Sequence, residues 1–128
     1  MDTTEFIRER GQHLVAVSTP LPPDRATSVA EEARTRSLAD HWAKTVDISN
    51  DDPPAVRRML RSLAIDNRAS VVVVWASTCL AITLTLDDFI ASYDDLWYPS
   101  SDDVWIFDPD KSWLIEFDHE EVVRFRGE

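Results

Sequence analysis

The chain has 128 residues, 44% of them hydrophobic, and a formal net charge of −11 at pH 7. This length and composition predict a single domain, residues 1–128, with its own hydrophobic core rather than a disordered chain. Two glycines leave no material for a glycine-rich loop that cradles a nucleotide phosphate, and a lone cysteine excludes an intramolecular disulfide. The cysteine content and the lack of an N-terminal basic segment followed by an apolar one predict a cytoplasmic protein without a signal peptide.

The N-terminal third is predicted to be mainly helical. Thr4 would cap a short helix that stops at Gly11, and residues 13–18 resemble a strand before the stiff connector 20–23. A long helix is expected over residues 24–46, but its apolar residues change sides near residues 35–37. We therefore expect a kink or break there, or a first half that is exposed and available to a partner.

A further helix is expected to begin after Asp52, which is a good N-cap, with Pro53 at the first helical position. Its apolar residues repeat at helical spacing, at Val56, Leu60 and Leu63. Its other face is basic, with Arg57, Arg58 and Arg61. We interpret these arginines as a solvated face or as internal partners of the acidic residues, because one short basic cluster on an acidic chain does not indicate a nucleic-acid site.

Residues 69–86 contain no charged side chain, which is about the minimum length for a membrane helix. The content favours strands instead, because residues 71–74 are all valine and residues 82–86 alternate apolar and polar side chains. We predict strands over 70–76 and 79–86, joined by a tight turn at Ser77 and Thr78, and no membrane span.

The C-terminal part is predicted to be one helix followed by strands. Thr85 and Asp88 form a capping pattern for a short helix, and a loop is expected from Asp94 onward. Strands over 104–107, 113–118 and 122–125 would then form a three-stranded meander. Because helices dominate the first half and strands the second, the fold class is predicted to be α+β, with N-terminal helices packed on a mostly antiparallel or mixed sheet.

The negative charge is concentrated in one stretch. Residues 87–121 hold twelve acids and a single lysine, whereas the rest of the chain is nearly balanced. Aromatic and acidic residues alternate in the predicted loop and the start of the next strand: Asp94, Asp95, Trp97, Tyr98, Asp102, Asp103 and Trp105. We predict that these residues bind a basic protein partner, because carboxylates steer a positive protein and aromatic rings supply central contact area.

Two alternatives to this assignment remain. The tryptophans, Trp97 and Trp105 together with Trp113, would otherwise pack in the domain's own core. The helix predicted over 24–46, with its split apolar faces, is a second candidate for the partner contact.

No metal site or cofactor is predicted. Asp108, Asp110 and Ser112 are spaced like the first ligands of a calcium loop, but Trp113 stands where that loop needs glycine. We therefore interpret residues 108–111 as a polar turn. Residues 118–121 carry possible metal ligands, but neighbouring side chains of an extended segment point to opposite faces and would need distant partners to bind a metal. We therefore interpret this segment as a turn.

No catalytic residue is predicted, so the protein is expected not to be an enzyme. A cysteine nucleophile with a histidine base would have to combine Cys79 with His13, His41 or His119. The uncharged residues around Cys79 instead predict a small buried side chain rather than an activated thiolate. Paired carboxylates such as Asp94 and Asp95 would perform acid and base chemistry only in a concave pocket with perturbed pKa values. A small hydrolase or isomerase remains the alternative from the enzyme class.

The segment from Asp94 through His119 also carries a family resemblance. Its Leu-Trp-Tyr-Pro, the following Asp-Asp-Val-Trp and the later Trp-Leu-Ile-Glu-Phe-Asp-His resemble small bacterial α+β proteins that act as immunity proteins of polymorphic toxin systems. The resemblance covers about a fifth of the chain. It implies an acidic, nonenzymatic, cytoplasmic protein that neutralises a toxin by covering its active site or an adjacent surface. For a basic nuclease, a carboxylate-rich face would stand in for the nucleic-acid backbone. A secretion adaptor or a regulatory protein is the alternative within the binding class.

Overall fold

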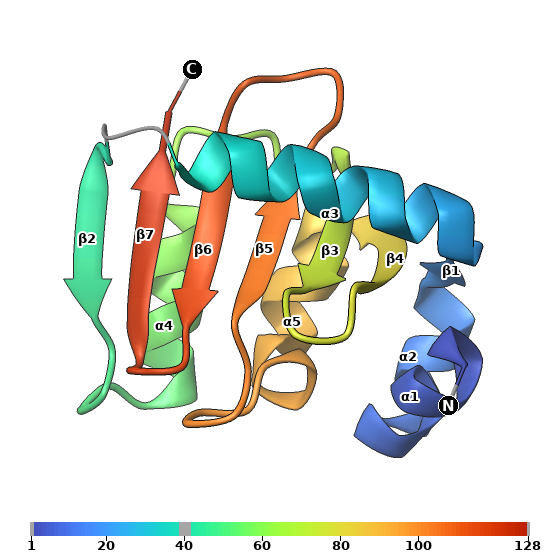
Figure 1. The fold of residues 1–128 in the computed structure, drawn as a ribbon. Coiled ribbons are helices and arrows are strands. Elements are labelled where there is room, and N and C mark those ends of the chain that lie inside the picture. Colours follow the sequence, from blue (N-terminus) through green and yellow to red (C-terminus); the bar gives the residue numbers. More distant parts are fainter. Residues whose placement is uncertain (1, 39–41, 128) are drawn as a thin grey trace.

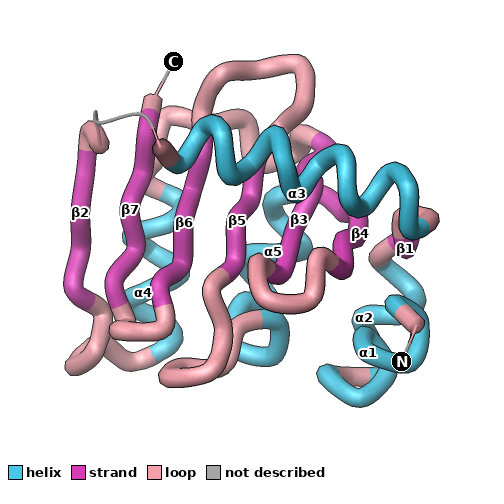
Figure 2. Tube along the Cα trace, viewed as in Figure 1, coloured by secondary structure: helices cyan, strands magenta, loops and turns pink. Residues whose placement is uncertain are grey.

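The computed structural model describes residues 2–38 and 42–127. Its centre is an antiparallel sheet with the strand order β1-β4-β3-β5-β6-β7-β2. The strands are β1 (Thr19–Pro20), β2 (Lys44–Asp47), β3 (Ser70–Trp75), β4 (Leu80–Thr85), β5 (Val104–Phe107), β6 (Leu114–Asp118) and β7 (Val122–Arg126). The helices are α1 (Thr3–Arg10), α2 (Gln12–Val17), α3 (Pro23–Ser37), α4 (Pro53–Arg61) and α5 (Leu86–Leu96). The α+β class and the C-terminal meander of β5, β6 and β7 are confirmed (Figures 1 and 2).

Helices cover both faces of the sheet. Helix α3 crosses one face, and α4 and α5 lie on the other, where α1 and α2 also bury Ile7 and Leu14 (Figure 1). On β3, Val71, Val73 and Trp75 belong to the larger core under α4 and α5, whereas Val72 and Val74 face α3. A strand buried on both sides needs apolar residues at every position, which explains the uncharged run. No helix in the described ranges has both the length and the apolar character that crossing a membrane requires.

The break expected near residues 35–37 is confirmed, but the helix predicted over residues 24–46 is wrong in its second half. Helix α3 ends at Ser37 and residues 44–47 form the strand β2, which pairs with β7. The first half is not exposed, because Ala26, Val29, Ala30 and Ala33 are buried against the sheet. Residues 39–41 lie outside the described part of the chain. The pairing with β7, which is distant in sequence, overrides the local helical pattern.

The strand predicted over residues 13–18 is also wrong. Residues 12–17 form the short helix α2, in which Leu14 is the buried residue. Helix α1 ends at Gly11 as predicted, but Asp2 rather than Thr4 caps it, accepting a hydrogen bond from the backbone N–H of Glu5 at 2.8 Å. The proline segment divides at Pro22: Thr19 and Pro20 pair with β4, and Pro23 begins α3.

Helices α4 and α5 begin where their capping residues predict. Asp52 accepts from the N–H of Ala55 at 2.9 Å, and Thr85 accepts from the N–H of Asp88 at 3.1 Å. Helix α5 runs to Leu96, beyond the start predicted for the loop. This extension places Asp94 in the last turn of a packed helix.

Candidate functional site

The seven residues predicted to bind a partner divide into two groups. Three are buried, with exposed fractions of 4% for Trp97, 7% for Asp102 and 8% for Trp105. The other four have exposed or half-exposed side chains: Asp94, Asp95, Tyr98 and Asp103. The fold thus separates acids and aromatics that are mixed in the sequence, and only the second group is available to a partner.

The buried tryptophans pack in the interior, as the alternative assignment holds. The ring of Trp97 lies 5.3 Å from that of Phe117, and its Nε1 donates to the Asp102 backbone oxygen at 3.0 Å. Trp105 packs in the core under α3 and donates from Nε1 to Glu116 at 2.9 Å. Trp113 belongs to the larger core. Each indole therefore has its apolar body covered, and those of Trp97 and Trp105 also have their N–H groups bonded.

Asp102 holds the loop between α5 and β5 in place. Its Oδ2 lies 2.5 Å from Nη1 of Arg10 and accepts the N–H of Tyr98 at 2.9 Å. The Arg10 guanidinium lies between two aromatic rings, 4.5 Å from the centre of Phe6 and 3.9 Å from that of Tyr98. The Asp102 carboxylate is buried and bonded to groups within the protein, so it positions the loop and does not face a partner.

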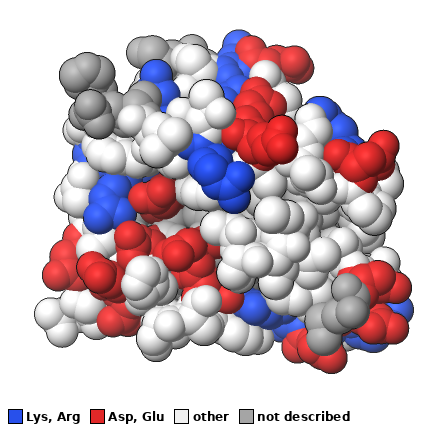
Figure 3. All heavy atoms as spheres, in the orientation of Figure 1, with Lys and Arg blue, Asp and Glu red and all other residues white. Residues whose placement is uncertain are grey.

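Acidic residues from three connections gather at one end of the sheet. The β2–α4 loop contacts the β6–β7 turn through the Ile48 N–H and the Glu121 oxygen, and the α5–β5 loop contacts the same turn through the Ser100 N–H and the His119 oxygen. We call the acids around this end the acidic rim: Asp47, Asp51, Asp52, Asp94, Asp103, Asp118, Glu120 and Glu121. Figure 3 shows acidic side chains gathered at the end of the sheet where β2 and β6 finish and β5 and β7 begin. The carboxylates of Asp51, Asp52 and Asp94 also act together with burial to raise the pKa of Tyr93, with burial the largest cause.

Three members of the rim were missed by sequence reasoning. Asp47, Asp51 and Asp52 lie outside residues 87–121 and reach the rim only because β2 pairs with β7. The local sequence identifies Asp52 solely as a helix cap. Conversely Asp95 lies apart from the rim on the side of α2, with its Oδ2 3.4 Å from Nε2 of His13.

A row of polar side chains crosses the sheet beside the rim, on the face that α3 partly covers. Trp105, Glu116, Arg124 and Thr45 are direct cross-strand neighbours on β5, β6, β7 and β2. Nη1 of Arg124 lies 3.0 Å from both Glu116 and Asp118. The hydrogen bond with Asp118 is the largest cause of the raised pKa of Arg124. Burial acts to raise the pKa of Asp118, but the Glu120 N–H and the Arg124 guanidinium outweigh it and lower that pKa.

His119 links two carboxylates of the rim. Its Nδ1 lies 2.9 Å from Asp103 and 3.3 Å from Asp118. The hydrogen bond with Asp103 is the largest cause of a raised His119 pKa. These three side chains have the donor types and spacing to hold a metal ion. A proton competes for the same histidine nitrogen, so the geometry equally describes a histidinium clamped between carboxylates.

The two turns read from the sequence are present. The Oδ1 of Asp108 accepts from the N–H of Asp110 at 2.9 Å, and the Oδ1 of Asp118 accepts from the N–H of Glu120 at 2.8 Å. Each aspartate thus bonds its own backbone two residues on, which is the usual role of aspartate in turns.

The raised pKa of His119 gives a pH prediction. The protonated His119 contributes to the stability of the fold. This contribution is fully present below pH 6.5, the ordinary pKa of histidine, and is lost as the pH rises through the raised pKa of the folded state. Titration by NMR is expected to place the His119 pKa above 6.5, and Asp103→Asn, which removes the main partner, is expected to lower it. A His119 pKa at or below 6.5 in the unmodified protein would contradict the clamp.

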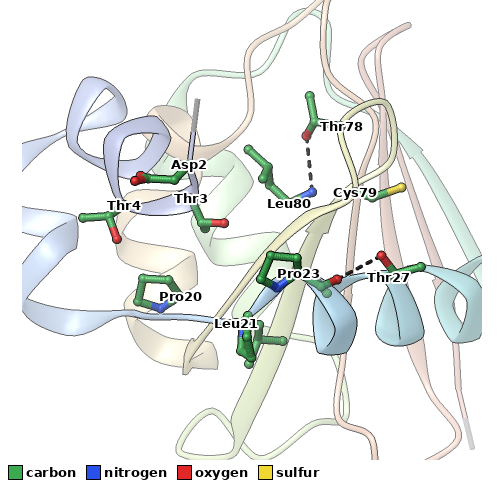
Figure 4. Close-up of a pocket in the computed structure, with 12 residues that line it drawn as sticks. Asp2, Thr3, Thr4, Pro20, Leu21, Pro23, Thr27, Thr78, Cys79 and Leu80 are labelled. Carbon is green, nitrogen blue, oxygen red and sulfur yellow. Dashed lines mark hydrogen bonds between the residues drawn. The ribbon is translucent and has the colours of Figure 1, made fainter.

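A separate groove of about 770 Å³ lies on the opposite side of the molecule, between the start of α1, the proline segment and the β3–β4 turn (Figure 4). Its lining residues are Asp2, Thr3, Thr4, Pro20, Leu21, Pro22, Pro23, Ala26, Thr27, Thr78, Cys79 and Leu80. Thr27 bonds the Pro23 oxygen and Thr78 accepts from Leu80, so these hydroxyls already have partners. Cys79 is half-buried, with φ of 56° in the turn. The lining contains no histidine that would activate it, and His41 lies outside the described residues.

No protein-family model, curated protein or solved structure matches this chain. Its function is therefore inferred from the surface chemistry of the molecule itself.

Proposed function

We propose that this protein is a noncatalytic inhibitor that neutralises a basic toxin or nuclease by direct binding, and that the acidic rim makes the contact. The observation that carries the proposal is the rim, in which carboxylates from three separate connections converge at one end of the sheet. Like charges do not gather without a cost in repulsion, and an opposing basic surface relieves that cost.

The rim contains both internally paired and free carboxylates. Arg57, His119 and Arg124 pair with Asp94, Asp103 and Asp118. Within residues 2–38 and 42–127, Asp47, Asp51, Asp52, Glu120 and Glu121 make no ion pair, although Asp47 and Asp52 accept local hydrogen bonds from Ser49 and from the Ala55 N–H. The free group supplies the negative field that steers a basic partner, and the paired group fixes the geometry of the surface.

Tyr98 adds an exposed aromatic side chain from the α5–β5 loop, which contacts the β6–β7 turn of the rim through Ser100 and His119. Tyr98 is 40% exposed, and one face of its ring is held by the Arg10 guanidinium at 3.9 Å. A tyrosine whose orientation is fixed before binding loses little conformational freedom at an interface. Tyr98 is thus the one aromatic residue of the seven predicted for partner binding that keeps this role in the proposal.

The test combines partner capture with a charge-reversed variant. Tagged protein is used to capture partners from a lysate of its source cells, and the double variant Asp51→Lys/Glu120→Lys is compared with Glu9→Lys/Glu31→Lys. All four residues are exposed, and the two variants change the net charge equally. The rim variant is expected to slow association with the captured basic protein by about tenfold or more at low ionic strength, whereas the control retains most of the rate.

The second part of the test is neutralisation in cells. Expression of the captured partner alone should arrest growth, and co-expression of this chain should restore it. A partner that does not arrest growth would reject the inhibitor function. Equal binding by the two variants would reject the rim as the contact.

A further inference from the structure

The two edges of the sheet differ in their capacity to accept another strand. Edge β1 consists of Thr19 and Pro20, and proline has no N–H to donate. Edge β2 has four residues, Lys44–Asp47, each of which carries both a donor and an acceptor. In Figure 1 β2 is the outermost strand beside β7, and no described element lies beyond it. An unprotected edge of this kind is a template for strand pairing.

The backbone register shows which groups of β2 point outward. Val46 lies opposite Val123, and two residues on, the Ile48 N–H donates to the Glu121 oxygen at 2.9 Å. Along a strand of an antiparallel pair, residues whose backbone N–H and C=O bond the partner strand alternate with residues whose N–H and C=O face away from it. The backbone groups of Val46 therefore bond β7. The N–H and C=O groups of Thr45 and Asp47 therefore face away from β7. Among the described residues they have no backbone hydrogen-bond partner, so they can pair with an added strand.

The side chains of β2 indicate the chemistry of that strand. Thr45 and Asp47 point to the sheet face that carries Arg124 and Val122, and Val46 points to the other face. Asp47 is exposed, and β2 leads directly into the acidic rim. Direct cross-strand neighbours on one face are close enough for opposite charges to attract. A lysine or arginine opposite Asp47 and an apolar residue opposite Val46 would complement this edge.

We propose that β2 accepts an extended basic segment of the partner as an eighth strand of the sheet. The inference rests on the proposed function and adds the mode of binding: backbone hydrogen bonds at Thr45 and Asp47 give affinity, and alternating basic and apolar side chains give specificity. A basic segment is the occupant that fits, because a second copy of this chain would carry its own net charge of −11 to the edge.

The probe is a capped hexapeptide of alternating lysine and valine, compared with the same peptide methylated on every internal backbone nitrogen. Both carry the same charge, but the methylated peptide has lost its internal backbone N–H donors. The unmethylated peptide is expected to slow hydrogen exchange of the Thr45 and Asp47 amides, and methylation is expected to weaken the Kd by about tenfold, since several hydrogen bonds are lost. Equal Kd values for the two peptides, or unchanged exchange at both amides, would overturn strand addition.

A matched pair of protein variants gives a second measurement. Thr45→Pro removes an outward N–H from the edge, whereas Thr45→Val keeps it and preserves the β-branched shape. Thr45→Pro is expected to bind the peptide about tenfold more weakly than Thr45→Val. A captured toxin that binds both variants equally would overturn strand addition and leave neutralisation standing. Peptide binding at β2 together with a captured partner that does not arrest growth would support strand addition and reject neutralisation.

Discussion

Replacing Trp97 by alanine is expected to destabilise the fold by about 3 to 5 kcal/mol, the usual cost of removing a large buried aromatic side chain. Trp97 is 4% exposed, packs on Phe117 and donates to the Asp102 backbone oxygen. The substitution leaves a cavity beside Phe117 and an unpaired carbonyl in the α5–β5 loop. Equilibrium unfolding in guanidinium chloride measures the loss.

Tyr98→Ala is the matched control for Trp97→Ala, because the two residues are adjacent and both are aromatic. Tyr98 is 40% exposed and contacts Arg10, so its loss is expected to cost about 1 kcal/mol. Unchanged stability of Trp97→Ala, combined with loss of partner binding, would return Trp97 to the interface and remove it from the core.

Asp102→Ala is expected to destabilise the protein by about 3 kcal/mol, because it leaves a buried guanidinium without its counter-charge. The side chains of Arg10 and Asp102 are 11% and 9% exposed, and their shortest N–O distance is 2.5 Å. The same carboxylate accepts the Tyr98 N–H, so the α5–β5 loop also loses its anchor to α1. The free energy of unfolding and the NMR signals of residues 98–103 are both expected to change.

Asp94→Ala supplies the comparison for Asp102→Ala. Its carboxylate pairs with Arg57 at 2.9 Å but is 42% exposed, so the expected cost is below about 1 kcal/mol. Removing both charges of the buried pair, as in Arg10→Met/Asp102→Ala, should be less damaging than Asp102→Ala alone. If the double variant is the less stable of the two, the uncompensated charge does not explain the loss.

Local signals in the sequence predict much of the chain from residue 52 onward. The caps at Asp52 and Thr85 locate the starts of α4 and α5, because a side-chain acceptor three residues before an N–H acts without tertiary help. The valine run of residues 71–74 and the alternation of residues 82–86 predict β3 and β4. Each of these signals lies within a few neighbouring residues, so it can be recognised in the sequence without knowledge of the fold.

The errors lie where a distant segment determines the local structure. Strand β2 forms because it pairs with β7, although Val46 stands at helical spacing from Leu38 and Trp42. Helix α2 forms next to α1 and buries Leu14 in the larger core, and residues 13–18 pair with no strand within the described ranges. Propensity is a weak preference, and tertiary pairing overrides it.

The sequence by itself determined the total charge, the concentration of acids in residues 87–121 and the α+β character of the chain. Only the tertiary structure decided which of those acids remain free and which aromatics are buried. Asp102 is neutralised by Arg10, which lies 92 residues earlier, and Asp47 joins the acidic rim through the pairing of β2 with β7. Burial and ion pairing depend on distances in space, and local sequence patterns do not carry those distances.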